Sequence, residues 1–175
     1  MIKYRTHVSN NKFINIAAFS ENLKYRYILS RDWKEDGDIL AFIMLNPSIG
    51  DEKILEKTTA GCMNRAYRLG YSGMVVLNLF AYISTEPKAL KTVKDPIGPL
   101  NDSIIESFFE KTEDQPGKVD VIAAWGRNGR YLDRDKEVIR LVRRPLMCLG
   151  QNKDGTPKHP LHLSYDELPR PYMQP

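Results

Sequence analysis

The sequence predicts a single α/β domain over residues 1–175, in which helices cover both faces of a central, mostly parallel four-stranded sheet. Two observations favour this three-layer α/β/α fold. Short apolar runs alternate along the chain with longer amphipathic segments, which is the pattern of buried parallel strands and their connecting helices. The chain of 175 residues also has the length of one domain, and its composition of 42% hydrophobic and 27% charged residues excludes a disordered or fibrous protein.

Four short apolar runs predict the strands of the central sheet. Each has the length of a strand and contains at most one polar residue, as expected of a strand that is buried on both faces. The runs are residues 39–45, 73–79, 119–125 and 145–149. Upstream, residues 13–19 and 25–30 predict additional N-terminal edge strands in an antiparallel arrangement.

Three amphipathic segments predict the covering helices. In residues 53–69 apolar side chains recur at helical spacing up to Gly70, a typical C-terminal stop. Residues 101–111 begin with two residue types that commonly cap helix N-termini and place four apolar residues on one face. Residues 132–142 predict the third helix.

The sequence carries no signal for secretion, a membrane, a metal or a cofactor. No apolar run approaches the roughly 18 residues that span a bilayer, and the N-terminus lacks the apolar segment of a signal peptide, so we expect a cytoplasmic protein. Cys62 and Cys148 lie in apolar stretches and are expected to be reduced core thiols. His159 and His162 could be two zinc ligands, but no third firm ligand accompanies them, and we expect no metal. Phosphate-loop, dinucleotide-binding and serine-hydrolase motifs are also missing from the sequence.

Positive charge is concentrated in the C-terminal part of the chain. The net charge is +4, whereas residues 118–158 alone contain ten Lys and Arg against five Asp and Glu. A basic stretch of this kind favours a polyanionic partner, nucleic acid above all, and it is equally compatible with a solvated helix face. The residues of this stretch predicted to contact DNA are Arg127, Arg130, Arg143, Arg144, Lys153 and Lys158.

Distinctive polar segments follow the four predicted core strands. Because ligands of an open parallel sheet bind beyond the carboxyl ends of its strands, their convergence predicts a ligand site at that edge. The segments are Asn46-Pro47-Ser48 with Asp51, Asn78 to Tyr82, Trp125 to Gly129, and Lys158 to Ser164. Each also has a structural interpretation, since Asn46-Pro47 fits a turn and Trp125 fits a core. An unpaired amide at Asn78 would cost roughly 1–3 kcal/mol, so we expect it to bond a loop or a ligand.

These segments resemble, in the same order, four motifs of the uracil-DNA glycosylase superfamily. The similar stretches are Met44 to Ser48, Val75 to Asn78, Ala123 to Gly126, and His159 to Ser164. The resemblance spans residues 40–165 and implies a uracil-DNA glycosylase-like α/β domain. The chain is also similar to a family of short microbial and phage proteins with a domain of unknown function, whose motifs are Leu-Asn-Pro-Ser, Asn-Leu-Phe-Ala-Tyr and Ala-Ala-Trp-Gly.

The resemblance to the glycosylases implies a role for individual residues. Asn46 would position the water that attacks the sugar, and Asn78 would hydrogen-bond the edge of an extruded base. His159 would donate to the base as negative charge develops on it, and Leu163 would fill the space left in the base stack. The other residues implied are Pro47, Ser48, Phe80 and Trp125 around the base, and His162, Leu163 and Ser164 against the DNA.

Three departures from the superfamily pattern suggest a larger pocket than uracil requires. Ser48 replaces a tyrosine, the stretch at residues 56–59 lacks a stacking phenylalanine, and Leu161 replaces a serine. Asp51 could activate the water in place of Asn46, or it could cap the following helix.

The sequence therefore predicts a monomeric DNA glycosylase that acts on a flipped, modified or bulky base without a metal or cofactor. One alternative is a hydrolase of free modified nucleotides or nucleosides in the same pocket. The other is a sensor that binds a flipped base without cleaving it, because the amide of Asn46 cannot abstract a proton.

Overall fold

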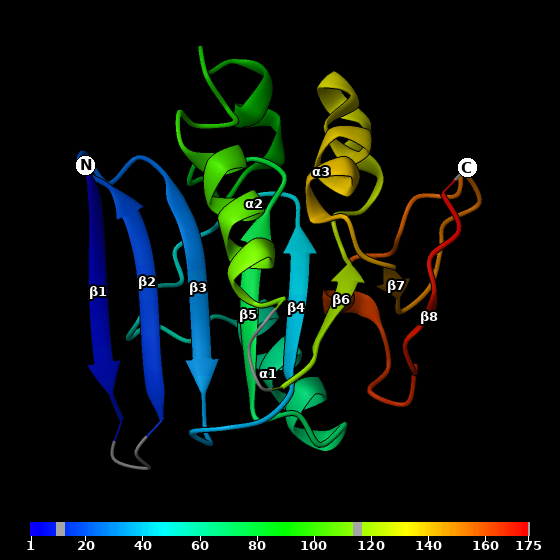
Figure 1. Ribbon diagram of the computed structural model, residues 1–175. Coiled ribbons are helices and arrows are strands. Elements are labelled where there is room, and N and C mark those ends of the chain that lie inside the picture. The colour runs from blue at the N-terminus through cyan, green and yellow to red at the C-terminus, as the bar shows by residue number, and fades with distance from the viewer. Residues whose placement is uncertain (10–12, 114–116, 175) are drawn as a thin grey trace.

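The computed structural model describes residues 1–9, 13–113 and 117–174 as one eight-stranded mixed sheet with three α-helices (Figure 1). The strand order across the sheet is β1-β2-β3-β5-β4-β6-β7-β8. The strands are β1 (Ile2–Val8), β2 (Ile14–Ser20), β3 (Arg26–Asp32), β4 (Ile39–Met44), β5 (Gly73–Asn78), β6 (Val119–Ala123), β7 (Met147–Cys148) and β8 (Arg170–Pro171). The helices are α1 (Lys57–Arg68), α2 (Asn101–Lys111) and α3 (Arg134–Val142), with short 3-10 helices η1 (Pro87–Lys91), η2 (Arg127–Asp133) and η3 (Pro160–His162).

The four predicted core strands are present and run parallel to one another. β4 lies in the middle of this part of the sheet, paired with β5 on one side and β6 on the other, and β7 follows β6. Their apolar runs made them visible in the sequence, because a strand buried on both faces needs no alternation of polar residues. The carboxyl ends of β4, β5 and β6 consequently meet at one edge of the sheet.

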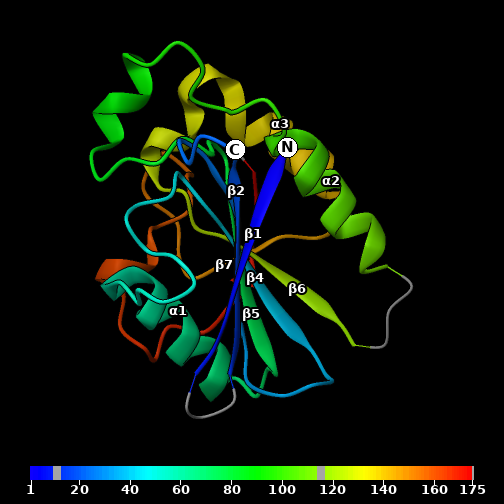
Figure 2. The ribbon, with the colours of Figure 1, turned by 90° about the vertical axis from the view of Figure 1, so that its left-hand side faces the viewer.

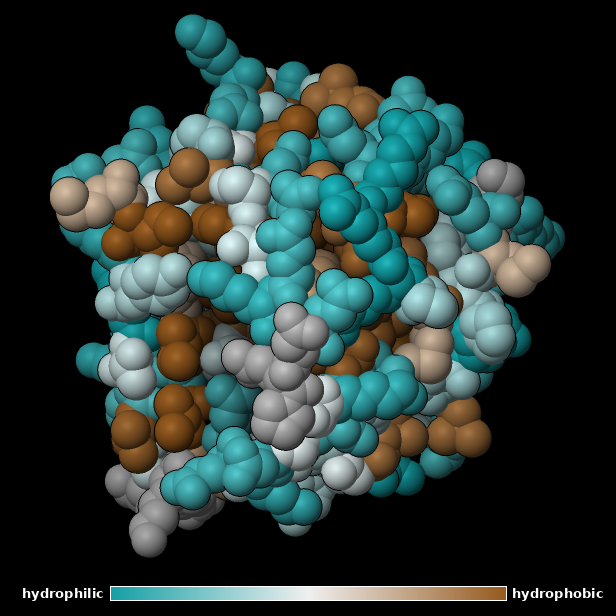
Figure 3. All heavy atoms as spheres, in the orientation of Figure 1, coloured by the Kyte–Doolittle hydropathy of each residue, from teal (hydrophilic) through white to brown (hydrophobic). Residues whose placement is uncertain are grey.

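The predicted four-stranded, three-layer fold is nevertheless wrong. β1, β2 and β3 form an antiparallel half that joins the parallel strands through β3 and β5, and β8 adds an antiparallel strand at the other edge. α1 lies on one side of the parallel strands and α2 and α3 lie on the other (Figure 2). None of the three helices covers β1 to β3, over which hydrophobic atoms lie between polar ones at the surface (Figure 3). The sheet is therefore larger than predicted, and its exposed residues are concentrated in the edge strand β1, because β2 and β3 are mostly buried.

Alternate residues of β4 face two separate hydrophobic cores. Leu40, Phe42 and Met44 pack with α1 and with residues of β2 and β3, whereas Ala41 and Ile43 pack with α2 and α3. This division follows from the two-residue period of a strand. The rigid sheet between the two cores fixes the positions at which its strands end.

The carboxyl group of Asp32 is largely buried where β3 meets β5. A side chain at Gly73 would collide with it, because a Cβ there would lie 2.4 Å from Oδ1 of Asp32. Burial raises the pKa of Asp32 to about 6, although a hydrogen bond from Ser30 opposes the rise. The native protein therefore holds this proton more tightly than the unfolded chain does between about pH 4 and pH 6.

We expect Asp32→Asn to stabilise the protein at pH 8 by about 1–3 kcal/mol, because it removes a buried charge. The contribution of this carboxyl to stability falls as the pH rises through that window, so the gain should vanish below about pH 3, where the wild-type carboxyl is protonated in both states. Urea unfolding at the two pH values measures the difference, with Asp36→Asn in an exposed bend as the control. A gain that is independent of pH would contradict the burial cost.

Candidate functional site

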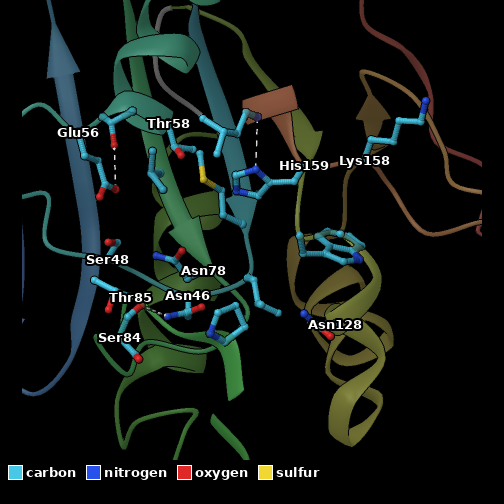
Figure 4. Close-up of a pocket in the computed structure, with 18 of the residues that line it drawn as sticks. Asn46, Ser48, Glu56, Thr58, Asn78, Ser84, Thr85, Asn128, Lys158 and His159 are labelled. Carbon is cyan, nitrogen blue, oxygen red and sulfur yellow. Dashed lines mark hydrogen bonds between the residues drawn. The ribbon is translucent and has the colours of Figure 1, made fainter. Parts of the chain in front are cut away.

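A cavity of about 710 Å³ opens where β4, β5 and β6 end (Figure 4). Its walls come from the loops that follow these strands, from the start of α1 and from the segment before η3. The residues that line it are Arg26, Met44, Leu45, Asn46, Ser48, Glu56, Thr58, Thr59, Val76, Asn78, Ser84, Thr85, Pro87, Trp125, Gly126, Arg127, Asn128, Asn152, Lys158, His159, Leu161 and Leu163. The structure thus brings together the four polar segments that the sequence predicted to converge.

Asn78 presents an unpaired amide to this cavity. The residue is 1% exposed, and neither its Nδ2 nor its Oδ1 has a hydrogen-bond partner among the described residues. A buried amide without a partner costs roughly 1–3 kcal/mol, which a folded protein rarely bears without a reason. The donor and the acceptor of this side chain are therefore available to a ligand.

The backbone of Asn78 is held from behind by two further buried polar residues. Nδ2 of Asn101, at the start of α2, donates to the carbonyl oxygens of Asn78 and Leu79 at 3.0 and 3.1 Å. Nε of Arg134, which is fully buried, donates to the same Leu79 carbonyl at 2.8 Å. The end of β5 is thus fixed through its backbone, and the Asn78 side chain takes no part in that support.

Asn46 connects two of the loops that wall the cavity. Its Nδ2 donates to the carbonyl oxygens of Pro47 at 3.0 Å and Ser84 at 2.8 Å. The carbonyl of Pro47 also accepts from the backbone N–H of Ser84, so Pro47 is buried in the loop contact and is not part of the lining. Asn46-Pro47 therefore serves as a turn between the loops, and Asn46 also lines the cavity.

Trp125 forms an apolar wall of the cavity directly after β6. It is 1% exposed, its ring packs edge-on against Tyr172, and its Nε1 has no hydrogen-bond partner within the described parts of the chain. The loop that follows needs glycine at two positions. Gly126 has a φ of +70°, and a Cβ at Gly129 would lie 2.0 Å from Cδ1 of Trp125.

His159 lies in the segment that leads into η3. Its Nδ1 accepts a hydrogen bond from the backbone N–H of Leu161 at 3.3 Å, which assigns the proton of the neutral ring to Nε2. Arg65 of α1 holds the continuation of this segment, because its guanidinium donates to the carbonyl oxygens of Leu163 and Ser164 at 2.9 and 2.6 Å. The position of His159 therefore depends on a contact between α1 and the C-terminal segment.

Sequence reasoning missed two charged residues of the cavity. Glu56, the residue before α1, is the only carboxylate among the described lining residues, and its Oε1 accepts from Oγ1 of Thr59 at 3.4 Å. Arg26 reaches the cavity from β3, is 2% exposed and donates to the carbonyl of Gly50. Burial lowers the pKa of Arg26 to about 10, which leaves it charged at neutral pH, while the nearby Glu56 favours that charge. The apolar pattern of the sequence could not show how β3 pairs, and this pairing brings Arg26 to the site.

Of the other residues predicted at the site, Phe80 and Ser164 do not line the cavity, whereas Leu163 does. Phe80 is fully buried in the core beside α2 and α3, where its ring contacts Tyr131. Leu163 lines the cavity and is half-buried against the opposite core, whereas Leu161 at the cavity is 38% exposed. Ser164 is exposed and hydrogen-bonds Asp166. The side chain of His162 lies outside the described parts of the structure.

Asp51 does not line the cavity. Its Oδ1 accepts the backbone N–H groups of Lys53 and Ile54 at 2.8 and 2.7 Å, which closes a turn before α1. Burial alone would raise the pKa of Asp51, but the hydrogen bonds from Ile54 and Lys53 and the charges of Arg5 and Arg31 outweigh it and lower the pKa. The geometry corresponds to the capping role that the sequence allowed.

The predicted DNA-binding cations divide into two groups. Arg127 and Lys158 line the cavity, and close to them Arg130 donates to the carbonyl of Asp154, while Lys153 is exposed in the same loop. Arg143 instead bonds to Glu106 of α2, and Arg144 bonds to Phe109 of α2 and to Thr112, which follows its last residue. These two arginines lie outside the cavity lining.

Cys62 and Cys148 are buried and free, and burial raises the pKa of the Cys62 thiol. Within the described residues, no group of three or more His, Cys, Asp or Glu is arranged to hold a metal ion. No helix of the described chain has both the length and the apolar character required to cross a membrane.

Comparison with known proteins identifies a family but not an activity. No curated protein and no solved structure matches the chain. A match to one protein family extends over residues 26–161, which include every residue of the cavity except Leu163. The chain therefore belongs to the family described as "Protein of unknown function (DUF1643)".

Proposed function

We propose that this protein binds a modified base extruded from DNA in the cavity and hydrolyses the bond between the base and its sugar. The observation that carries the proposal is the unpaired amide of Asn78, buried at the cavity. An amide offers one donor group and one acceptor, as the hydrogen-bonding edge of a base does. The apolar face of Trp125 offers a surface for the ring.

The chemistry of the cavity suits the departure of a base. Cleavage of the glycosidic bond leaves negative charge on the base, and a fixed N–H donor stabilises that charge. The Nε2–H of His159 is such a donor. The volume of about 710 Å³ has room for a base with a substituent, as expected from the small side chain of Ser48 where the superfamily pattern has a tyrosine. The resemblance of four motifs to the uracil-DNA glycosylase superfamily supports the proposal from the sequence alone.

The charge around the cavity favours DNA over a free nucleotide. Arg127 and Lys158 line it, and Arg130 and Lys153 lie in adjoining segments. Several cations spaced along a groove fit successive phosphates of a strand, whereas a free nucleotide needs fewer of them. We propose that the protein acts as a cytoplasmic monomer on DNA and uses no metal or cofactor.

Removing the charge of Arg127 tests where a bound DNA strand lies on the protein. We expect Arg127→Gln to reduce the slope of log affinity against log salt by about 0.7–0.9, the value of one phosphate contact. Arg143→Gln is the matched control, because both side chains are 68% exposed and each pairs with one acid, Asp154 or Glu106. A slope that changes with Arg143 and not with Arg127 would place the DNA across α3, outside the cavity.

One observation favours the alternative of a base sensor without catalysis. Asp51 is engaged in a turn away from the cavity, and the amide of Asn46 cannot take a proton from water. Under this alternative the same amide of Asn78 reads the base, and the glycosidic bond stays intact.

The experiment that separates these functions is base release. Purified protein is incubated with single- and double-stranded DNAs that carry uracil, hydroxymethylated or glucosylated pyrimidines, and free bases and abasic sites are measured. Release from one substrate supports the glycosylase. Binding without release supports the sensor, and release from nucleosides or nucleotides alone supports the hydrolase of free nucleotides.

A further inference from the structure

We infer that Glu56 is the residue that activates water in this cavity. The inference rests on the proposed function, and it concerns a residue that neither the motifs nor the basic stretch of the sequence indicated. Hydrolysis of a glycosidic bond needs a group that takes a proton from the attacking water, in addition to the donor that stabilises the departing base. Asn46 and Asn78 cannot supply it, because amides do not accept a proton near neutral pH.

Glu56 lies on the opposite side of the cavity from His159 (Figure 4). The side chain of Asn78 lies below both of them in the same view, at the end of β5. Water must attack the sugar on the face away from the base, so the proton acceptor and the donor to the base have to stand on opposite sides of the substrate. The separation of Glu56 from His159 meets this requirement.

The carboxylate of Glu56 is held in place by its surroundings. Oγ1 of Thr59 donates to Oε1, and a Cβ at Gly50 would lie 3.1 Å from Cγ and Cδ of Glu56, so the side chain packs against the preceding loop. The loop is itself held by two guanidinium groups of β3. Arg26 donates to the carbonyl of Gly50, and Arg31 donates to the carbonyls of Asp51 and Glu52. A fixed carboxylate is what orienting a water requires.

The buried charge of Arg26 adds an electrostatic argument. Arg26 is 2% exposed, has no carboxylate ion pair within the described structure, and has its Nε without a partner there. The nearby Glu56 favours the charged form of Arg26, so the two side chains attract each other across this wall of the cavity. An ionised carboxylate can accept the proton of water, whereas a protonated one cannot.

In the proposed step, the oxygen of water attacks the anomeric carbon of the nucleotide while the bond from that carbon to the base nitrogen breaks. The electron pair of the broken bond leaves with the base, where the Nε2–H of His159 hydrogen-bonds it. The proton of the water passes to the carboxylate of Glu56. The products are the free base and an abasic sugar with a new hydroxyl group, and the carboxylate later returns its proton to solvent or to the base.

The test compares single-turnover base release by wild type and Glu56→Gln on whichever DNA the wild type cleaves. We expect Glu56→Gln to lower the rate at least about 100-fold, the usual contribution of a general base, with DNA binding unchanged. Glu86→Gln is the matched control, because Glu86 precedes η1, is exposed and does not line the cavity. Unchanged DNA binding and thermal unfolding show that the Gln variant is folded.

A second variant separates proton transfer from structural support. Glu56→Ala leaves space for a small carboxylate, and added formate should restore part of its lost rate without affecting Glu86→Gln. Unchanged release by Glu56→Gln overturns the inference, as does a loss of release in Asp51→Asn that exceeds the loss in Glu56→Gln. If the wild type releases no base from any DNA, the proposed function fails instead, and the two failures are therefore distinguishable.

Discussion

His159→Ala is expected to lower base release by about 100-fold or more while DNA binding stays close to that of the wild type. The reason is that the Nε2–H of the ring acts on charge that develops only as the base departs, so its loss raises the barrier more than it weakens binding. Single-turnover release and equilibrium binding to the same DNA measure the two effects separately.

His7→Ala is the control for this variant. His7 lies on β1, at the outer edge of the antiparallel half, and it does not line the cavity. Normal release by His159→Ala would remove His159 from the proposed reaction. A parallel loss of binding and thermal stability would instead show that the segment held by Arg65 has moved.

Asn78→Leu is expected to make the protein more stable and to abolish recognition of the base. The wild-type amide has both polar atoms buried without a partner, so replacing it with an apolar side chain of similar size should raise the free energy of unfolding by about 1 kcal/mol. Base-dependent binding should fall at least about tenfold, because the donor and acceptor for the base are lost. Urea unfolding and binding to DNA with and without the modified base measure these opposite changes.

Asn101→Leu provides the comparison for Asn78→Leu. Its Nδ2 donates to two backbone carbonyls, so its loss should destabilise the protein by about 1–3 kcal/mol. The same chemical change at two buried asparagines should therefore move stability in opposite directions. Destabilisation of both variants would mean that the Asn78 amide supports the fold, and would argue against its proposed role as the ligand contact.

The parallel strands and the convergence of the site could be predicted because both depend on local patterns. Apolar runs identified β4, β5 and β6, and the rule that ligands meet the carboxyl ends of such strands brought Asn46, Asn78 and Trp125 together. The prediction of a helix at residues 101–111 was confirmed by α2, which has those bounds.

Two strands of the antiparallel half, β2 and β3, were predicted as N-terminal edge strands, but β1, the pairing of β3 with the parallel strands and the supporting residues could not be predicted in this way. Strand pairing between β3 and β5 joins residues about 45 positions apart, and no local pattern specifies it. Glu56 precedes α1 at a position where a carboxylate commonly serves only the helix N-terminus, so its residue type carried no signal of a cavity. Phe80 was expected beside the base, but β5 ends at Asn78, and beyond that point the Phe80 ring turns into the core beside α2 and α3.

Arg26 and Arg31 of β3 hold the loop from Asn46 to Glu56 through its backbone carbonyl oxygens, which every residue carries whatever its side chain. These contacts do not depend on the side chains at the accepting positions, whereas the side chains of Asn46 and Asp51 hold the loop at two other points. Ser48 lies on it at the cavity wall, and larger or smaller residues there should change the shape offered to a ligand without shifting the ends of the loop. Such a loop gives the fold a means to acquire new ligand preferences through single substitutions at little risk to folding.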